Sequence, residues 1–258
     1  MSKLPDVLWL NTSPSLQYFA QPLLRYLSDL VIIQEWKYRQ SQDEVSSLDA
    51  AVVLLHDYLK SCNRPVHLIG HSTGGLLGLL YSRRYPETVK SLTLLAVGVD
   101  AAVDWQAHYY MHRQFLSRQK LLTDMVYNLF GYQDKRTLKS LTHLLEQDLD
   151  CSLSPHSLFE RVSIKANKVA VPLMVCGSLN DIIVEPEALQ GWRSPLVLFR
   201  RRAFLSLFPL SACSRTATRL LEVYPGIRFA VFLFATLGIN IMIIHLKNDL
   251  LSKTNVRG

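Results

Sequence analysis

The chain has 258 residues, of which 49% are hydrophobic and 19% are charged, and its formal net charge is +7. This length fits one large α/β domain or two small ones, and the apolar fraction is enough for a sizeable core. Residues 193–258 carry ten Lys and Arg against two Asp and Glu, whereas residues 1–192 are nearly neutral. The main part of the chain therefore gives no reason to expect a nucleic-acid-binding surface.

The cysteines and histidines form no pattern of metal ligands or of a redox pair. No two of the four cysteines have C-x-x-C spacing. His108 and His112 have the i, i+4 spacing of one helix face, but no acidic third ligand accompanies them. We therefore expect no metal and no cofactor. The first residues lack the apolar segment of a secretory signal peptide, which favours a cytoplasmic protein.

The first half of the chain predicts alternating strands and helices. Residues 6–10 and 30–33 are apolar runs typical of strands, and residues 19–27 and 43–60 have the apolar spacing of helices. Further apolar runs predict strands at 66–69, 89–97 and 171–176. Alternation of this kind predicts an α/β fold with a doubly wound, mostly parallel sheet.

A glycine-rich motif follows the predicted strand at residues 66–69. Residues 70–74 read G-H-S-T-G, and an apolar helix up to residue 85 follows them. A strand, a sharp turn with a serine at its tip and a helix together make a nucleophile elbow, with Ser72 as the nucleophile. The residues that shape the turn around this serine are Gly70, His71 and Gly74.

The strand pattern is interrupted between residues 97 and 171. Residues 104–168 are polar, aromatic and helical in pattern, which predicts a helical cap inserted between two strands of the sheet. Ordinary crossover helices are the alternative. The aromatic residues of this segment favour a hydrophobic acyl or aromatic small-molecule substrate; they are Trp105, Tyr109, Tyr110 and Phe115.

An acidic residue follows the last of these strands. Asp181 lies in the loop after residues 171–176, and Asp100, just past residues 89–97, is the second candidate for the acid. With the elbow at Ser72, the loop from Gly177 to Asp181 resembles, in order and spacing, the α/β-hydrolase superfamily. The resemblance covers residues 5–192 and is closest to the AB hydrolase-1 type, with cap-bearing, esterase- and lipase-like members.

The resemblance implies a catalytic triad in the order Ser, Asp, His, with an acyl-enzyme formed at the serine. Ser72 and Asp181 match the first two members. The resemblance also implies an oxyanion hole made of two backbone N–H groups. By position these belong to Thr73 and Ser13, although Asn11 and Thr12 replace the usual His-Gly pair.

The general base is missing from the position that the resemblance implies. His245 is the one histidine after Asp181, and it lies inside the apolar run 229–246 rather than in a polar loop. The change coincides with the shift to basic charge after Trp192. We therefore divide the chain into a hydrolase-like domain, 1–192, and an atypical tail, 193–258. A shifted reading frame or a replaced gene end would produce such a tail, and a divergent final strand and helix is the alternative.

The apolar run 229–246 is flanked by basic residues. Its length is near the lower limit for a membrane-spanning helix, so a single span, a buried helix and an out-of-frame segment all remain open. Three functional interpretations follow. The chain is a serine hydrolase of ester or related acyl bonds, impaired by the missing histidine; a non-catalytic binding protein of the same fold; or such a protein tethered to a membrane.

Overall fold

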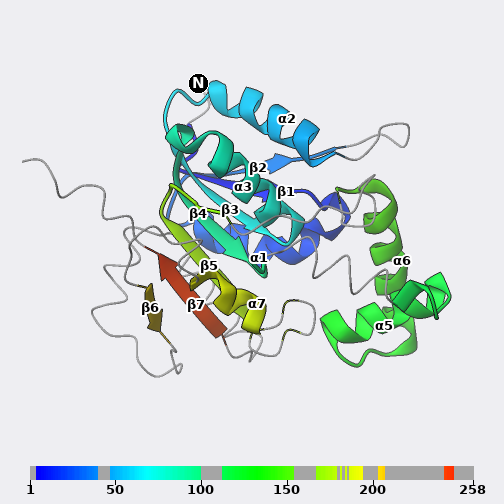
Figure 1. The fold of residues 1–258 in the computed structure, drawn as a ribbon. Helices are drawn as coiled ribbons and strands as arrows, with labels where there is room; N and C mark the ends of the chain where they lie inside the picture. The colour runs from blue at the N-terminus through cyan, green and yellow to red at the C-terminus, as the bar shows by residue number, and fades with distance from the viewer. Residues whose placement is uncertain are drawn as a thin grey trace, which may run out of the picture.

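Helices cover both faces of a central β-sheet (Figure 1). The computed structural model describes residues 4–39, 47–99, 112–153, 167–178, 181, 184, 186–193, 203–206 and 241–246. Within these residues one sheet has seven strands, in the order β2-β1-β3-β4-β5-β7-β6. They are β1 (Val7–Asn11), β2 (Ile33–Lys37), β3 (Val66–His71), β4 (Val89–Leu95), β5 (Leu173–Ser178), β6 (Ala203–Ser206) and β7 (Ile241–Leu246).

The strands β1 to β5 run parallel to one another, and β7 runs antiparallel to both β5 and β6. The predicted doubly wound, mostly parallel sheet is therefore confirmed. In a parallel sheet the carboxyl ends of all strands meet at one edge, so the loops after β1, β3, β4 and β5 gather there.

Three of the helices between the strands begin at a residue whose side chain caps them. The longer ones are α1 (Gln17–Ser28), α2 (Leu48–Lys60), α3 (Thr73–Arg84), α5 (Arg118–Phe130) and α6 (Lys135–Cys151), and α7 (Pro186–Gln190) is short. Short 3₁₀ turns are η1 (Pro14–Leu16), η2 (Pro86–Thr88) and η3 (Gly191–Arg193). The Asp134 carboxylate accepts the N–H groups of Arg136 and Thr137 at the start of α6.

The strand side chains alternate between two apolar layers. Leu8 and Leu10 of β1 pack on one face, in the cluster that also holds buried residues of α2 and α3. Val7 and Trp9 pack on the other face with Leu23 and Leu27 of α1. This alternation is the period of two that a strand imposes on its side chains. Since both faces are buried, the central strands read as continuous apolar runs.

The second strand lies further along the chain than predicted. Residues 30–33 were expected to form it, but β2 spans Ile33–Lys37, and Leu30 and Ile32 are exposed. β2 is at the edge of the sheet, and only its residue Trp36 is buried. A half-exposed edge strand does not need an apolar run, because its polar side chains face water or neighbouring polar groups.

The segment predicted as a cap lies between β4 and β5, and α5 and α6 make up much of its described part. They form a helical hairpin around the buried side chains Leu121, Leu122, Met125, Val126, Leu145 and Leu149. In Figure 1 the hairpin, drawn in green, stands beside the sheet, away from β6 and β7.

The run 229–246 does not form one continuous helix. Its last six residues are strand β7, hydrogen-bonded between β5 and β6. Residues 229–240 lie outside the described part of the chain. None of the helices in the described residues is long and apolar enough to cross a membrane.

Candidate active site

Ser72 lies at the sharp turn between β3 and α3. Its φ of 50° and ψ of −123° put it in a backbone region that non-glycine residues rarely adopt. The turn is held on both sides. The Ser72 N–H donates to the Leu95 carbonyl of β4 at 3.0 Å, and its carbonyl accepts from the Leu76 N–H at 2.9 Å. Such strain is characteristic of functional sites, where the surrounding structure maintains it.

Glycines on each side allow the tight turn. A Cβ at Gly70 would collide with the backbone of Gly74 and Gly75, and a Cβ at Gly74 would collide with the Leu10 carbonyl oxygen. The start of α3 therefore packs directly against the strand before the turn and against the end of β1. Close approach of backbones is the reason that the motif requires glycine at these two positions.

The two expected oxyanion donors, the N–H groups of Thr73 and Ser13, differ in their hydrogen bonding. Thr73 is the first residue of α3, and the first N–H groups of a helix have no partner within the helix. The helix N-terminus also carries partial positive charge, which favours an oxyanion. The N–H of Ser13, in contrast, donates to the Asn11 side-chain oxygen at 3.0 Å. A substrate oxyanion would have to share or replace that bond.

Asn11 is the centre of a polar network after β1. It is only 5% exposed, and its amide nitrogen donates to Glu35 of β2 at 2.7 Å. Glu35 in turn pairs with Lys37 at 3.1 Å. The Asn11 backbone carbonyl accepts from the Tyr38 N–H. This network fixes the Asn11 side chain and, through it, the turn that ends at Ser13.

Asp181 lies past the end of β5, at the same edge of the sheet as Ser72. Its carboxylate accepts the Val184 N–H at 3.1 Å, which closes the loop on itself. The Asp181 carboxylate interacts electrostatically with the ring of His71, the exposed last residue of β3. Asp181 therefore lies within electrostatic reach of the residue next to Ser72. Asp100 is outside the described residues.

The backbone of His245 is far from the elbow. His245 is paired with Met174 of β5, Met174 is paired with Thr93 of β4, and Thr93 is paired with Ile69 of β3. His245 is therefore level with Ile69. Ile69 is three residues before the elbow serine, and three strand spacings separate β7 from β3. At about 3.3 Å per residue and about 4.8 Å per strand, the two backbones are roughly 17 Å apart.

Sequence reasoning missed one carboxylate close to the expected oxyanion loop. Asp148 of α6 is 5% exposed, it accepts a hydrogen bond from the Ser152 hydroxyl at 2.8 Å, and its helix contacts η1, which begins next to Ser13. Burial raises the pKa of Asp148 to about 6. The turn η1 and α6 lie in distant parts of the sequence, so no local spacing could have indicated this contact.

The described residues contain no group of three or more His, Cys, Asp or Glu side chains that could hold a metal ion. Two buried thiols, Cys62 and Cys176, are free, and burial raises the pKa of Cys176 to about 12. A thiol held neutral in this way is a poor nucleophile. Of the aromatic residues expected in the cap, Phe115 is 81% exposed, and the other three lie outside the described residues.

The strained serine turn between a parallel strand and a helix agrees with a comparison of the chain with protein families. The family described as the alpha/beta hydrolase fold matches residues 49–195. The chain belongs to the α/β-hydrolase fold family. The match ends close to Trp192, whose indole N–H donates to the Val97 carbonyl at 2.9 Å beside β4.

Two cyanobacterial relatives are similar to most of the chain. An uncharacterized protein of Nostoc sp. strain PCC 7120 is 47% identical over 193 residues, which are 74% of this chain and 77% of the relative. An uncharacterized protein of Synechocystis sp. strain PCC 6803 is 45% identical over 189 residues, 72% and 75% of the two chains. Among solved structures, a hydrolase from Pseudomonas aeruginosa has a TM-score of 0.55 at 14% identity, over 74% of this chain and 77% of that one. At this identity it shows the fold alone.

Proposed function

We propose that this α/β-hydrolase is a serine hydrolase that attacks an ester or related acyl bond through Ser72, with Asp181 as the acid of its triad. The strained elbow carries the proposal, because it presents the serine at the N-terminus of α3. The Thr73 N–H would stabilise the oxyanion formed on attack. The reacting serine hydroxyl must lose its proton to a base, and the acyl group then passes from Ser72 to water.

The proposal includes impaired turnover. A triad base must come within about 3 Å of the serine hydroxyl. In the sheet register, His245 is level with Ile69, which is three residues before the elbow serine. Removal of one triad member leaves about 10³- to 10⁴-fold acceleration over water, from the oxyanion hole and binding. We therefore assign slow acylation of Ser72 to this chain, and we keep ligand binding without turnover as the second function.

Labelling with a fluorophosphonate tests the nucleophile. The reagent should modify Ser72, slowly and stoichiometrically, as identified by mass spectrometry of the labelled peptide. Ser72→Ala should abolish the modification. Ser28→Ala is the matched control, since Ser28 is an exposed serine at the end of α1, and it should label like the unchanged chain. Absence of label at Ser72, or label that persists in Ser72→Ala, contradicts the proposal.

Chemical rescue distinguishes an impaired hydrolase from a binding protein. If only the base is missing, added imidazole should accept the Ser72 proton and accelerate labelling. A general base contributes about 10²- to 10⁴-fold, and we expect a freely diffusing one to restore at least about tenfold. The acceleration should be absent from Ser72→Ala, which also corrects for the direct reaction of imidazole with the reagent. Equal rates with and without imidazole would favour the binding protein.

We further propose that residues 193–258 replace the usual end of this fold. The proposal is supported by three features: the family match that ends at residue 195, the concentration of basic charge, and the antiparallel β6 and β7 after five parallel strands. The nucleotide sequence around codon 192 tests it. Another frame should encode a continuation that contains a histidine in a polar loop; absence of such a frame would support a genuine, divergent end.

The substrate class that we propose is a small hydrophobic acyl compound. Aromatic side chains gather where the hairpin meets α1, with Phe19 stacked on Phe130 at 5.0 Å between ring centroids. A series of p-nitrophenyl esters of increasing chain length, assayed with imidazole, should react faster with longer acyl groups. A preference for acetate would contradict this.

A further inference from the structure

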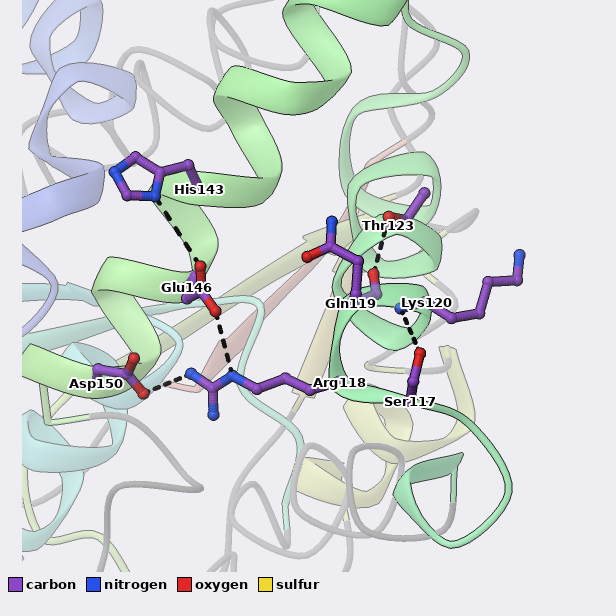
Figure 2. Close-up of polar contacts among 8 residues, drawn as sticks. All are labelled: Ser117, Arg118, Gln119, Lys120, Thr123, His143, Glu146 and Asp150. Atoms are coloured by element: carbon purple, nitrogen blue, oxygen red, sulfur yellow. Dashed lines mark hydrogen bonds and ion pairs between the residues drawn. The ribbon is translucent and has the colours of Figure 1, made fainter.

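The two ends of the hairpin formed by α5 and α6 differ in how their charges are paired. At the open end, Arg118 of α5 forms ion pairs with Glu146 and Asp150 of α6, as Figure 2 shows. Lys120, also in the first turn of α5, pairs with Asp124 one turn further along. The cations at this end are therefore neutralised by carboxylates of the hairpin itself.

The connected end of the hairpin, residues 127–139, which we call the tip, carries cations without such partners. Lys135, Arg136 and Lys139 are exposed, and none of them forms an ion pair with another residue that the structure describes. Asp134 is the acidic residue of the tip, and its carboxylate already accepts hydrogen bonds from the first turn of α6. Three cations and one carboxylate leave the tip with a net charge of +2.

This arrangement of charge is unfavourable for α6 alone. The N-terminus of a helix carries partial positive charge, so cations near it are destabilising. The first turn of α6 contains no acidic residue. Lys135 and Lys139 are also four residues apart, a spacing at which like charges on a helix repel each other. Residues that oppose local rules without a compensating contact are expected where they serve a function, such as binding an anionic partner.

Exposed aromatic side chains lie on the same tip and continue onto α1. Tyr132, between the two helices, is 90% exposed, and its ring stacks on Tyr127 of α5. Phe130, at the end of α5, stacks on Phe19 of α1 with 5.0 Å between ring centroids. Tyr18 is 73% exposed and meets Phe19 edge-on at 5.3 Å. The tip therefore combines unpaired positive charge with aromatic surface that is open to solvent.

We propose that the tip docks on the surface of a lipid bilayer that contains anionic lipid. Tyrosine rings suit the headgroup region, because they are apolar in body and polar at the hydroxyl. Lysine and arginine lay their apolar stems along such a surface and place their charges at the lipid phosphates. The docking does not require the chemistry of Ser72, so it goes beyond the proposed hydrolase activity.

A single-stranded nucleic acid is the other polyanion that binds aromatic and basic surfaces, by stacking its bases on free rings. At the tip, Tyr127 and Tyr132 already stack on each other. The exposed Leu129 beside them adds aliphatic surface, which has no ring for a base to stack on but inserts readily among lipid chains. These two features favour the bilayer.

Co-sedimentation of the full chain with vesicles tests the docking. Vesicles of phosphatidylcholine and phosphatidylserine in equal parts should bind the chain, and vesicles of phosphatidylcholine alone should bind it far more weakly. Each cation near an anionic surface is worth about fivefold in binding. The triple variant Lys135→Gln, Arg136→Gln, Lys139→Gln should therefore bind the anionic vesicles about 100-fold more weakly.

A matched triple variant separates the tip from net charge, which matters because residues 193–258 are also basic. Lys60→Gln, Arg84→Gln, Lys90→Gln removes the same charge from exposed positions at the ends of α2 and α3 and the start of β4. It should lose less than about fivefold. Equal losses in the two triple variants, or no loss in either, would overturn the proposal.

The aromatic part of the tip is tested by two substitutions of Tyr132. Tyr132→Ala should weaken binding about tenfold, because the lost ring no longer leaves water, and it should keep the dependence on salt. Tyr132→Trp should gain fluorescence that brominated lipids quench on binding. Leu54→Trp, at an exposed apolar position of α2, should gain fluorescence without quenching. Equal quenching of the two added tryptophans, or none, would overturn insertion of the tip.

Two other partners are distinguished in the same preparations. Analytical ultracentrifugation without vesicles should find no dimer that Tyr132→Ala dissociates; such a dimer would assign the tip to a second copy of the chain. A single-stranded oligonucleotide should bind more weakly than the anionic vesicles. Tighter binding of the oligonucleotide, lost in the Lys135→Gln, Arg136→Gln, Lys139→Gln variant, would assign the tip to nucleic acid. Either result would overturn the proposal.

Discussion

At the scale of single residues, the elbow depends on glycines, because their lack of a Cβ lets two backbone segments approach closely. Gly74 packs with its Cα against the Leu10 carbonyl, and there is no room for a methyl group. We expect Gly74→Ala to lower the free energy of unfolding by about 1–3 kcal/mol or more, as overpacking of a rigid contact does. Urea unfolding, followed by tryptophan fluorescence, measures the change.

Gly131 provides the control for that substitution. It ends α5 with a φ of 69°, but a Cβ there would meet nothing within 4 Å. Gly131→Ala should therefore destabilise through backbone strain alone, by about 1–3 kcal/mol. It should leave labelling of Ser72 unchanged, whereas Gly74→Ala should slow it. Equal effects of the two alanines on labelling would show that the fit at the elbow is unimportant.

The sequence predicts the elbow well because its determinants are local. The glycines, the preceding strand and the following helix all lie between Val66 and Arg84, and steric rules act on neighbours. The state of Ser13 could not be predicted in this way. Its N–H donates to the Asn11 side chain, and the turn η1 that follows it contacts α6, a helix that is distant in the sequence. Such contacts arise only when the hairpin has docked.

At the scale of elements, the apolar core between α5 and α6 should stabilise the hairpin more than its exposed ion pairs do. Leu122 is fully buried between α5 and α6, and Leu122→Ala should lower the free energy of unfolding by about 2–5 kcal/mol. Arg118 forms exposed ion pairs, which are worth about 0–1 kcal/mol each. Arg118→Ala should therefore lower the free energy of unfolding by less than about 2 kcal/mol. Thermal unfolding at low and high salt compares them, and a larger loss for Arg118→Ala would contradict this account.

The register of β7 gives a prediction for the last histidine. Its backbone lies level with Ile69 and three strands away from the elbow. We expect His245→Ala to leave the hydrolysis of p-nitrophenyl esters unchanged, and Ser72→Ala to remove whatever hydrolysis exceeds the background. Robust turnover abolished by both substitutions would identify His245 as the base and would require the tail to fold differently.

Element positions were predictable where burial dominates. The buried strands β1, β3 and β4 lie within two residues of their predicted places, because both of their faces need apolar side chains. The edge strand β2 was misplaced by three residues at its start, since its polar residues Gln34 and Glu35 find partners in Tyr58 and Asn11. Periodicity alone does not reveal such partners.

At the scale of the whole molecule, two buried groups oppose one another as pH changes. His67 lies at the start of β3 with its ring against the Ser91 hydroxyl at 2.6 Å, and burial, with Lys90 nearby, lowers its pKa to about 4. Folding therefore favours neutral His67, and this stability is lost as pH falls from 6.5 through about 4. Asp148, with its pKa raised to about 6, is favoured in the neutral form, and that stability is lost as pH rises from about 4 through 6.

The two effects nearly cancel in the natural chain, and single substitutions should separate them. Each pKa lies about two units from its ordinary value, which corresponds to about 3 kcal/mol at about 1.4 kcal/mol per unit. Asp148→Asn should therefore make the free energy of unfolding rise by about 3 kcal/mol from pH 4 to 6.5, because the opposing effect of Asp148 is then absent. His67→Asn, which keeps a polar group beside Ser91, should make the free energy of unfolding fall by a similar amount from pH 4 to 6. Urea unfolding across this range measures both slopes, and parallel curves for the two variants would show that neither group titrates as its surroundings indicate.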